Sequence, residues 1–152
     1  MAAYVAGTCA GLIGFGALAD RIATRRLFAC SLAATALLSL ACSVAPSIEV
    51  LIVLRAAQGA IAAGPAVFAP AIVKAMFDEE RAVRAMGLLG SIEALAPALA
   101  PIAGAALLTL GGWRVSFEVL AAAAALLALL VVLIGRLPQI SQRPRGTYLA
   151  LL

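Results

Sequence analysis

Long uninterrupted stretches of apolar residues are the feature that most limits what this chain can fold into. A run of about 18 or more apolar residues is long enough to cross a bilayer. Because backbone N–H and C=O groups find no water in lipid, each such run must be helical. Five predicted spans cover residues 1–19, 27–44, 48–77, 85–110 and 115–137. They predict a helical bundle over residues 1–137 and a cytoplasmic segment over residues 138–152.

The composition argues against several other classes of protein. Charged residues make up only 12% of the chain and apolar residues 65%, whereas a soluble domain has about 25% charged residues. The chain has no His, and its three Cys are far apart in the sequence, so we expect no metal site, no cofactor and no enzyme activity. Aromatic residues are too few and too scattered to stack nucleic-acid bases. No nucleic-acid partner is therefore expected.

The basic residues predict how the spans are oriented. Nine of the 11 Lys and Arg residues follow the first, third or fifth span, which places them on one side of the membrane. That side is cytoplasmic by the positive-inside rule. The orientation predicts a multi-pass protein of the cell inner membrane with Met1 outside and the C-terminal tail in the cytoplasm. The nine residues are Arg21, Arg25, Arg26, Lys74, Arg81, Arg84, Arg136, Arg143 and Arg145.

Two charged residues lie inside predicted spans. Arg55 is about 10 Å deep in the third span at 1.5 Å per residue, where a guanidinium costs about 2.5 kcal/mol or more. We expect it to face a cavity or a partner, with Gln58 one turn later on nearly the same face. The alternative is that Arg55 reaches up to the outer headgroups. Glu93 in the fourth span is either a protonatable site or partner of an Arg, or a polar residue facing the bundle's water-filled centre.

Small residues and prolines predict how the helices pack. Close approach through small residues drives helix association in lipid. Pro97 and Pro101 each remove a backbone hydrogen bond, so the fourth span is expected to bend. The rows of small residues at i, i+4 spacing are Gly7 and Gly11, Ala60 and Gly64, and Ala96, Ala100 and Gly104.

Two clusters of charges have simple structural explanations. Asp78 is expected to cap the fourth helix, with Glu79 and Glu80 in its first turn, where carboxylates complement the helix dipole. Arg114 and Glu118 are four residues apart, the spacing at which opposite charges on a helix interact. We expect them to pair at the membrane interface.

Four segments resemble signatures of the major facilitator superfamily, in the family's order. Residues 16–26, GALADRIATRR, resemble the loop 2-3 signature Gly-x-Leu-x-Asp-Arg-x-Gly-Arg-Arg/Lys. Residues 51–59, LIVLRAAQG, resemble the helix 4 signature Leu-x-x-x-Arg-x-x-Gln-Gly of proton-coupled members. Residues 96–105 are similar to the helix 5 antiporter signature Gly-x-x-x-Gly-Pro-x-x-Gly-Gly. Residues 112–117 look like the loop 5-6 element of drug/proton antiporters.

The resemblance implies an all-α membrane protein whose five spans correspond to helices 2–6 of this fold, without helix 1 and the C-terminal half. Arg55 would be the coupling residue facing the central cavity. With the interior position of Glu93, the predicted coupling and cavity set is Arg55, Gln58 and Glu93. The implied cytoplasmic gating loop contains Gly16, Asp20, Arg21, Arg25 and Arg26. The implied bending and packing residues of helix 5 are Pro97, Pro101 and Gly104.

The expected function is therefore part of a proton-coupled secondary transporter that exports drugs or other small molecules. The expected partners are the lipid bilayer, the substrate, helix 1 and the C-terminal half, and the proton is the expected coupling ion. We expect the chain not to transport by itself. The alternative is a small membrane module that does not transport and assembles with partner helices.

Overall fold

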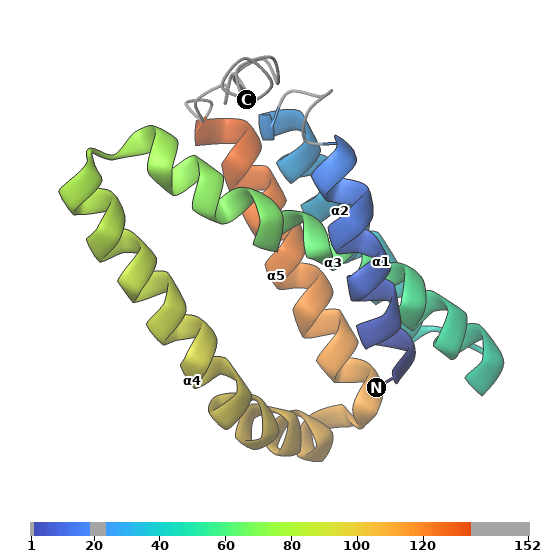
Figure 1. Ribbon diagram of the computed structural model, residues 1–152. Coiled ribbons are helices and arrows are strands. Elements are labelled where there is room, and N and C mark those ends of the chain that lie inside the picture. The colour runs from blue at the N-terminus through green and yellow to red at the C-terminus, as the bar shows by residue number, and fades with distance from the viewer. Residues whose placement is uncertain (1, 19–23, 135–152) are drawn as a thin grey trace.

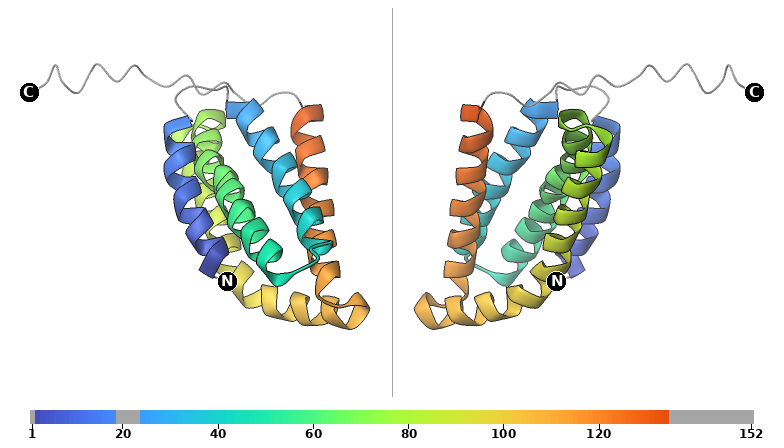
Figure 2. Two further views of the ribbon diagram at one scale, coloured as in Figure 1. Left: turned by 90° about the vertical axis from the view of Figure 1, so that its right-hand side faces the viewer. Right: turned by 90° about the vertical axis from the view of Figure 1, so that its left-hand side faces the viewer.

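The computed structural model describes residues 2–18 and 24–134, and this part of the chain consists of helices joined by short turns (Figure 1). The helices alternate in direction, so that the starts of α2 and α4 and the end of α5 lie at one end of the molecule (Figure 2). The chain is thus an all-α membrane protein. The helices are α1 (Ala2–Leu18), α2 (Thr24–Ser43), α3 (Ile48–Met76), α4 (Glu79–Gly111) and α5 (Trp113–Ile134).

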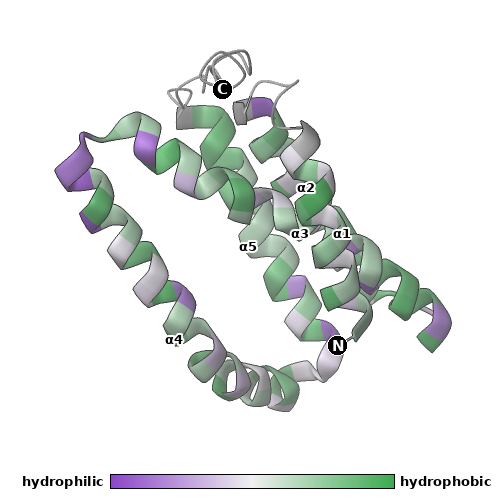
Figure 3. Ribbon diagram, viewed as in Figure 1, coloured by the Kyte–Doolittle hydropathy of each residue, from purple (hydrophilic) through white to green (hydrophobic). Residues whose placement is uncertain are grey.

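Four of these helices, α2 to α5, are long and apolar enough to cross a membrane. Helix α1 is also apolar, but its 17 residues span about 25 Å, less than the roughly 30 Å of a bilayer's hydrocarbon core. Apolar residues make up most of each helix, and hydrophilic residues gather near the helix ends, most clearly at the turn between α3 and α4 (Figure 3). Many of the large apolar side chains are exposed. Water cannot be the solvent for surfaces of this kind.

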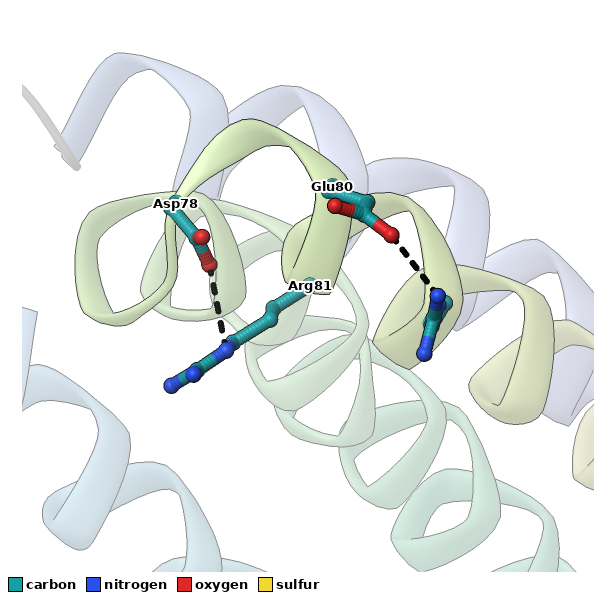
Figure 4. Close-up of polar contacts among 4 residues, drawn as sticks. Asp78, Glu80 and Arg81 are labelled. Carbon is teal, nitrogen blue, oxygen red and sulfur yellow. Dashed lines mark hydrogen bonds and ion pairs between the residues drawn. The ribbon is translucent and has the colours of Figure 1, made fainter.

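Helix α2 begins earlier than its apolar run predicts, whereas α4 begins directly after Asp78, the residue predicted to cap it. Helix α2 begins at Thr24 and α4 at Glu79, and the carboxylates of Glu79 and Glu80 in the first turn of α4 complement its helix dipole. Asp78 takes the N-cap position of α4, but its side chain makes no capping hydrogen bond. It pairs instead with Arg81, Oδ1 to Nε 3.6 Å (Figure 4). In the next turn the Glu80 carboxylate accepts a 2.7 Å hydrogen bond from the Nη2 atom of Arg84.

Glycines bring α1 and α3 into backbone contact. A Cβ atom on Gly7 would collide with the carbonyl oxygen of Ala56, and one on Gly11 with that of Ala60. From the other side, a Cβ atom on Gly59 would collide with the carbonyl oxygen of Tyr4. The predicted row of Gly7 and Gly11 therefore packs against α3, as close approach in lipid requires.

The other interfaces join the remaining helices to this pair. Helix α2 packs against both α3 and α5, so it lies between the α1–α3 pair and α5. Near the start of α2, Leu27 packs with Phe68 and Ile72 of α3 in a small core cluster. The ring of Phe15 on α1 meets that of Phe68 edge-on, with the centroids 5.9 Å apart. Three helices thus share this core.

Helix α4 lies largely apart from the other helices. Ala82 is its one buried residue, and its long curved ribbon meets the rest of the described structure near its two ends (Figure 1). Its last part crosses the end of the bundle towards α5 (Figure 2). Gly112, with φ at +80°, forms the tight turn into α5, a backbone conformation that favours glycine.

Candidate functional site

Arg55 lies in α3 and reaches side chains of two other helices. Its Nη1 atom donates a 2.8 Å hydrogen bond to Oε1 of Gln58, one turn further along α3. Its guanidinium carbon lies 5.0 Å from the ring centre of Tyr4 on α1 and 5.0 Å from that of Phe117 on α5. A cation over an aromatic face at this distance is attracted by the ring's quadrupole. The Arg55 side chain of α3 thus contacts Gln58 of the same helix, Tyr4 of α1 and Phe117 of α5.

Gln58 connects Arg55 to α2. Its side chain is almost completely buried, at 1% exposure, and its Nε2 atom donates a 2.7 Å hydrogen bond to Oγ of Ser39. The thiol of Cys42 lies 3.9 Å from the Gln58 Oε1 atom. Ser39 and Cys42 are fully buried. The result is a polar cluster between α2 and α3, formed by Ser39, Cys42, Arg55 and Gln58.

The face of α2 that carries Ser39 bears a row of hydroxyl groups that the sequence analysis missed. Each hydroxyl donates to a backbone carbonyl three or four residues earlier in α2. A signal was available, since Ser or Thr recurs at every fourth position of the span and so occupies one helix face. The row consists of Ser31, Thr35, Ser39 and Ser43.

The charge of Arg55 meets only neutral groups in the described part of the chain. A guanidinium has five N–H donors. Within residues 2–18 and 24–134, Arg55 makes one hydrogen bond, two ring contacts and no ion pair. Its other donors are therefore available to water or to an acceptor from outside this part of the structure.

Glu93, the third member of the predicted coupling and cavity set, lies apart from the other two. Its side chain is exposed on α4 and makes no hydrogen bond or ion pair with any described residue. Arg55 and Gln58 are in direct contact, whereas the structure does not bring Glu93 to them. A role for Glu93 in coupling stays a prediction.

The predicted gating loop is only partly within the described structure. Asp20 and Arg21 lie outside the described residues, as does the side chain of Arg25. Gly16 near the end of α1 and Arg26 in the first turn of α2 are both exposed. The gating role of this loop stays a prediction.

The predicted bending and packing residues lie in the exposed part of α4. Pro97 and Pro101 are inside this helix, which continues through both and follows a curved path (Figure 1). A Cβ atom on Gly104 would meet nothing within 4 Å, and Ala96 and Ala100 are exposed. Within the described residues, this row of small residues therefore has no helix packed against it.

The expected ion pair at the start of α5 is not formed. Arg114 lies over the ring of Trp113, 4.9 Å from its centre, and no ion pair joins it to Glu118 among the described residues. Stacking on the neighbouring aromatic ring has replaced the i, i+4 contact. Glu118 instead lines an open groove of about 470 Å³ between α2 and α5, whose other lining residues are Ala and Leu.

The sequence was also compared with known proteins. Residues 1–147 match the sequence profile of the Major Facilitator Superfamily. The chain belongs to this superfamily. The match covers all five described helices.

Several relatives are named for drug resistance. The chain is 35% identical to the multidrug resistance protein Stp of Mycobacterium tuberculosis over 120 residues, which are 78% of this chain and 22% of that protein. It is 34% identical to the methylenomycin A resistance protein of Streptomyces coelicolor over 118 residues, 75% of this chain and 24% of that protein. It is 33% identical to the uncharacterized MFS-type transporter YdgK of Bacillus subtilis over 135 residues, 88% of this chain and 34% of that protein.

The chain therefore spans between about a fifth and a third of the length of these relatives. It is a multi-pass membrane protein of this superfamily.

Proposed function

We propose that this chain forms part of a proton-coupled transporter that exports small molecules across the cell membrane, and that it is not an enzyme. The observation that carries the proposal is Arg55, a cation inside a membrane-spanning helix that donates to a buried Gln58. Burying an ionisable group inside a membrane-spanning segment costs free energy. Such groups are therefore rare, and those that occur commonly mark substrate or ion pathways. The resistance proteins among the relatives support an exported substrate.

Arg55 is the proposed coupling residue. Its charge is compensated by an amide oxygen and two aromatic rings rather than by a carboxylate among the described residues. A cation held in this way would attract a carboxylate supplied from outside the described residues and would favour the release of that carboxylate's proton. The approach and departure of a proton would therefore change the energy of the site, which is what coupling requires.

The proposed partners include further helices of the same transporter. Helix α4 exposes Glu93 and both prolines, and Ala82 is its one buried residue. A carboxylate facing lipid is costly, so the proposal places protein or water against this side of α4. Helix 1 and the C-terminal half of the transporter would supply that protein, and the chain alone is expected not to transport.

The proposed orientation places the starts of α2 and α4 in the cytoplasm. Arg26, Lys74, Arg81 and Arg84 lie at these helix ends or close to them, and all of these ends lie on one side of the molecule (Figure 2). The positive-inside rule favours this side as the cytoplasmic one.

The proposal is tested by efflux of an amphipathic fluorescent dye, driven by a proton gradient, from vesicles that hold a transporter containing this chain. Arg55→Ala is expected to abolish gradient-driven efflux while leaving membrane insertion intact. Arg84→Ala is the matched control, because it removes an exposed guanidinium at the start of α4. Normal efflux with Arg55→Ala would refute the coupling role, and clear gradient-driven efflux by the chain alone would refute the need for further helices.

A further inference from the structure

We propose that Ser39 of α2 is a positioning residue for Arg55 of α3, and that it acts through the side-chain amide of Gln58. Ser39 does not touch Arg55. Its Oγ atom lies 2.7 Å from Nε2 of Gln58, whose Oε1 atom in turn lies 2.8 Å from Nη1 of Arg55. An effect of Ser39 on transport rests on the proposed coupling function of Arg55. The positioning of Arg55 by Ser39 can be tested without measuring transport.

The direction of each hydrogen bond follows from the protons available. The Ser39 hydroxyl has one proton, which it donates to the backbone carbonyl of Thr35 at 2.7 Å. Its oxygen is left with acceptor capacity alone, so the Gln58 atom facing it must be the amide nitrogen. Arg55 has only donors, so the Gln58 atom facing it must be the amide oxygen. Arg55 and Ser39 thus require the same orientation of the Gln58 amide, and so does the Cys42 thiol, which donates to the same Oε1 atom at 3.9 Å.

Removing the Ser39 oxygen would remove the acceptor of the Gln58 N–H, while the two donors to Oε1, Arg55 and Cys42, would remain. The Gln58 amide would then have a buried N–H group without an acceptor, a costly arrangement in a medium of low dielectric. Rotation of the amide to find another acceptor would turn the carbonyl oxygen away from Arg55. The guanidinium would lose its hydrogen bond and shift relative to the rings of Tyr4 and Phe117.

Ser43 provides a matched control on the same helix. It is also buried, at 3% exposure, and its hydroxyl also donates to a backbone carbonyl, that of Leu40, at 2.8 Å. Unlike Ser39, it accepts no hydrogen bond from Gln58. Ser43→Ala thus removes an equivalent hydroxyl from α2 without touching the contact to Arg55.

The test uses nuclear magnetic resonance of the ¹⁵N-labelled chain in lipid nanodiscs. Ser39→Ala is expected to raise the hydrogen-exchange rate of the Gln58 side-chain amide by about tenfold and to shift the guanidinium signals of Arg55. Ser39→Thr is expected to restore both signals, since Thr35 already makes the same bond to a backbone carbonyl one turn earlier. Ser43→Ala is expected to change neither. Unchanged Arg55 signals in Ser39→Ala, or equal changes in Ser43→Ala, would overturn the proposal.

A second pair of variants tests whether Ser39 acts through Gln58. In the background of Gln58→Met, Ser39→Ala is expected to produce no further shift of the Arg55 signals, because the connecting amide is already absent. Additive shifts would overturn the proposed route. A further shift in this background would overturn the proposed route even if Ser39→Ala alone proves too unstable to measure.

The efflux assay separates this proposal from the proposed function. Ser39→Ala is expected to slow gradient-driven efflux by about tenfold, and Ser39→Thr to retain it. If Arg55→Ala abolishes efflux and Ser39→Ala leaves it unchanged, the positioning role is refuted. If Arg55→Ala leaves efflux unchanged, the proposed coupling function fails, and the resonance experiment still decides whether Ser39 positions Arg55.

Discussion

Arg55 and Gln58, three residues apart on α3, form a 2.8 Å hydrogen bond that links an exposed side of the helix to its buried side. Gln58 is buried against α2, whereas Arg55 is partly exposed and faces the rings of Tyr4 and Phe117. The bond thus joins a cation on α3 to an amide that packs against α2. Four predictions follow from this contact and from the helix packing around it.

Replacing Gln58 tests how much the polar cluster contributes to stability. Gln58→Met has a similar size but leaves Arg55 without its acceptor and Ser39 without its donor. The free energy of unfolding is expected to fall by about 1–3 kcal/mol, measured by denaturation in mixed micelles. Ser91→Ala is the control, because its hydroxyl bonds the backbone on the exposed surface of α4. Equal stability of Gln58→Met and the unmodified chain would contradict a stabilising role for the hydrogen bonds of Gln58 to Arg55 and Ser39.

Adding one methyl group to α1 tests its contact with α3. Gly7→Ala places a Cβ atom against the backbone carbonyl of Ala56, so the helices must separate, at a cost of about 1–3 kcal/mol. Gly14→Ala, on the same helix, meets nothing within 4 Å and is expected to be neutral or to stabilise by about 0.5–1 kcal/mol through helix propensity. The two variants are compared by thermal unfolding. Destabilisation of similar size in both would argue against this register of α1 on α3.

The aromatic contacts of Arg55 are tested at Tyr4 and Phe117. Phe117→Leu removes the ring on α5 and is expected to cost about 0.5–2 kcal/mol in stability. Because Trp113, the chain's single Trp, meets Phe117 edge-on at 5.9 Å, its fluorescence should report the change. Tyr4→Phe keeps a ring beside Arg55 and should leave both stability and the fluorescence spectrum close to those of the unmodified chain. A loss of stability in Tyr4→Phe equal to that in Phe117→Leu would show that the rings are not the relevant groups.

The ion pairs at the start of α4 should contribute little. Arg84 and Glu80 are 2.7 Å apart, but their side chains are 79% and 76% exposed. A pair that is this exposed is expected to be worth about 0.2–1 kcal/mol and to weaken as salt is added. A double-mutant cycle with Arg84→Ala and Glu80→Ala, measured at low and high salt, gives the coupling energy. A coupling energy well above this range, unaffected by salt, would contradict a solvated helix start.

Much of the architecture was predictable from the sequence, because lipid restricts a chain more than water does. The described helices lie on the long apolar runs, although α2 begins earlier than its run because Arg25 and Arg26 are also helical. The four signature segments led to the correct family. The expected pair of Arg114 and Glu118 was wrong, because a nearby aromatic ring offered Arg114 a different partner.

By itself, the sequence determined that this protein is a helical membrane protein of the major facilitator superfamily with a cation and an amide on one face of a span. It could not determine what that cation meets. Tyr4, Ser39 and Phe117 come from three other helices, and their arrangement depends on how each helix is rotated and how closely it approaches its neighbours. Those quantities are decided by packing, above all by the glycines between α1 and α3, and packing exists only in the tertiary structure.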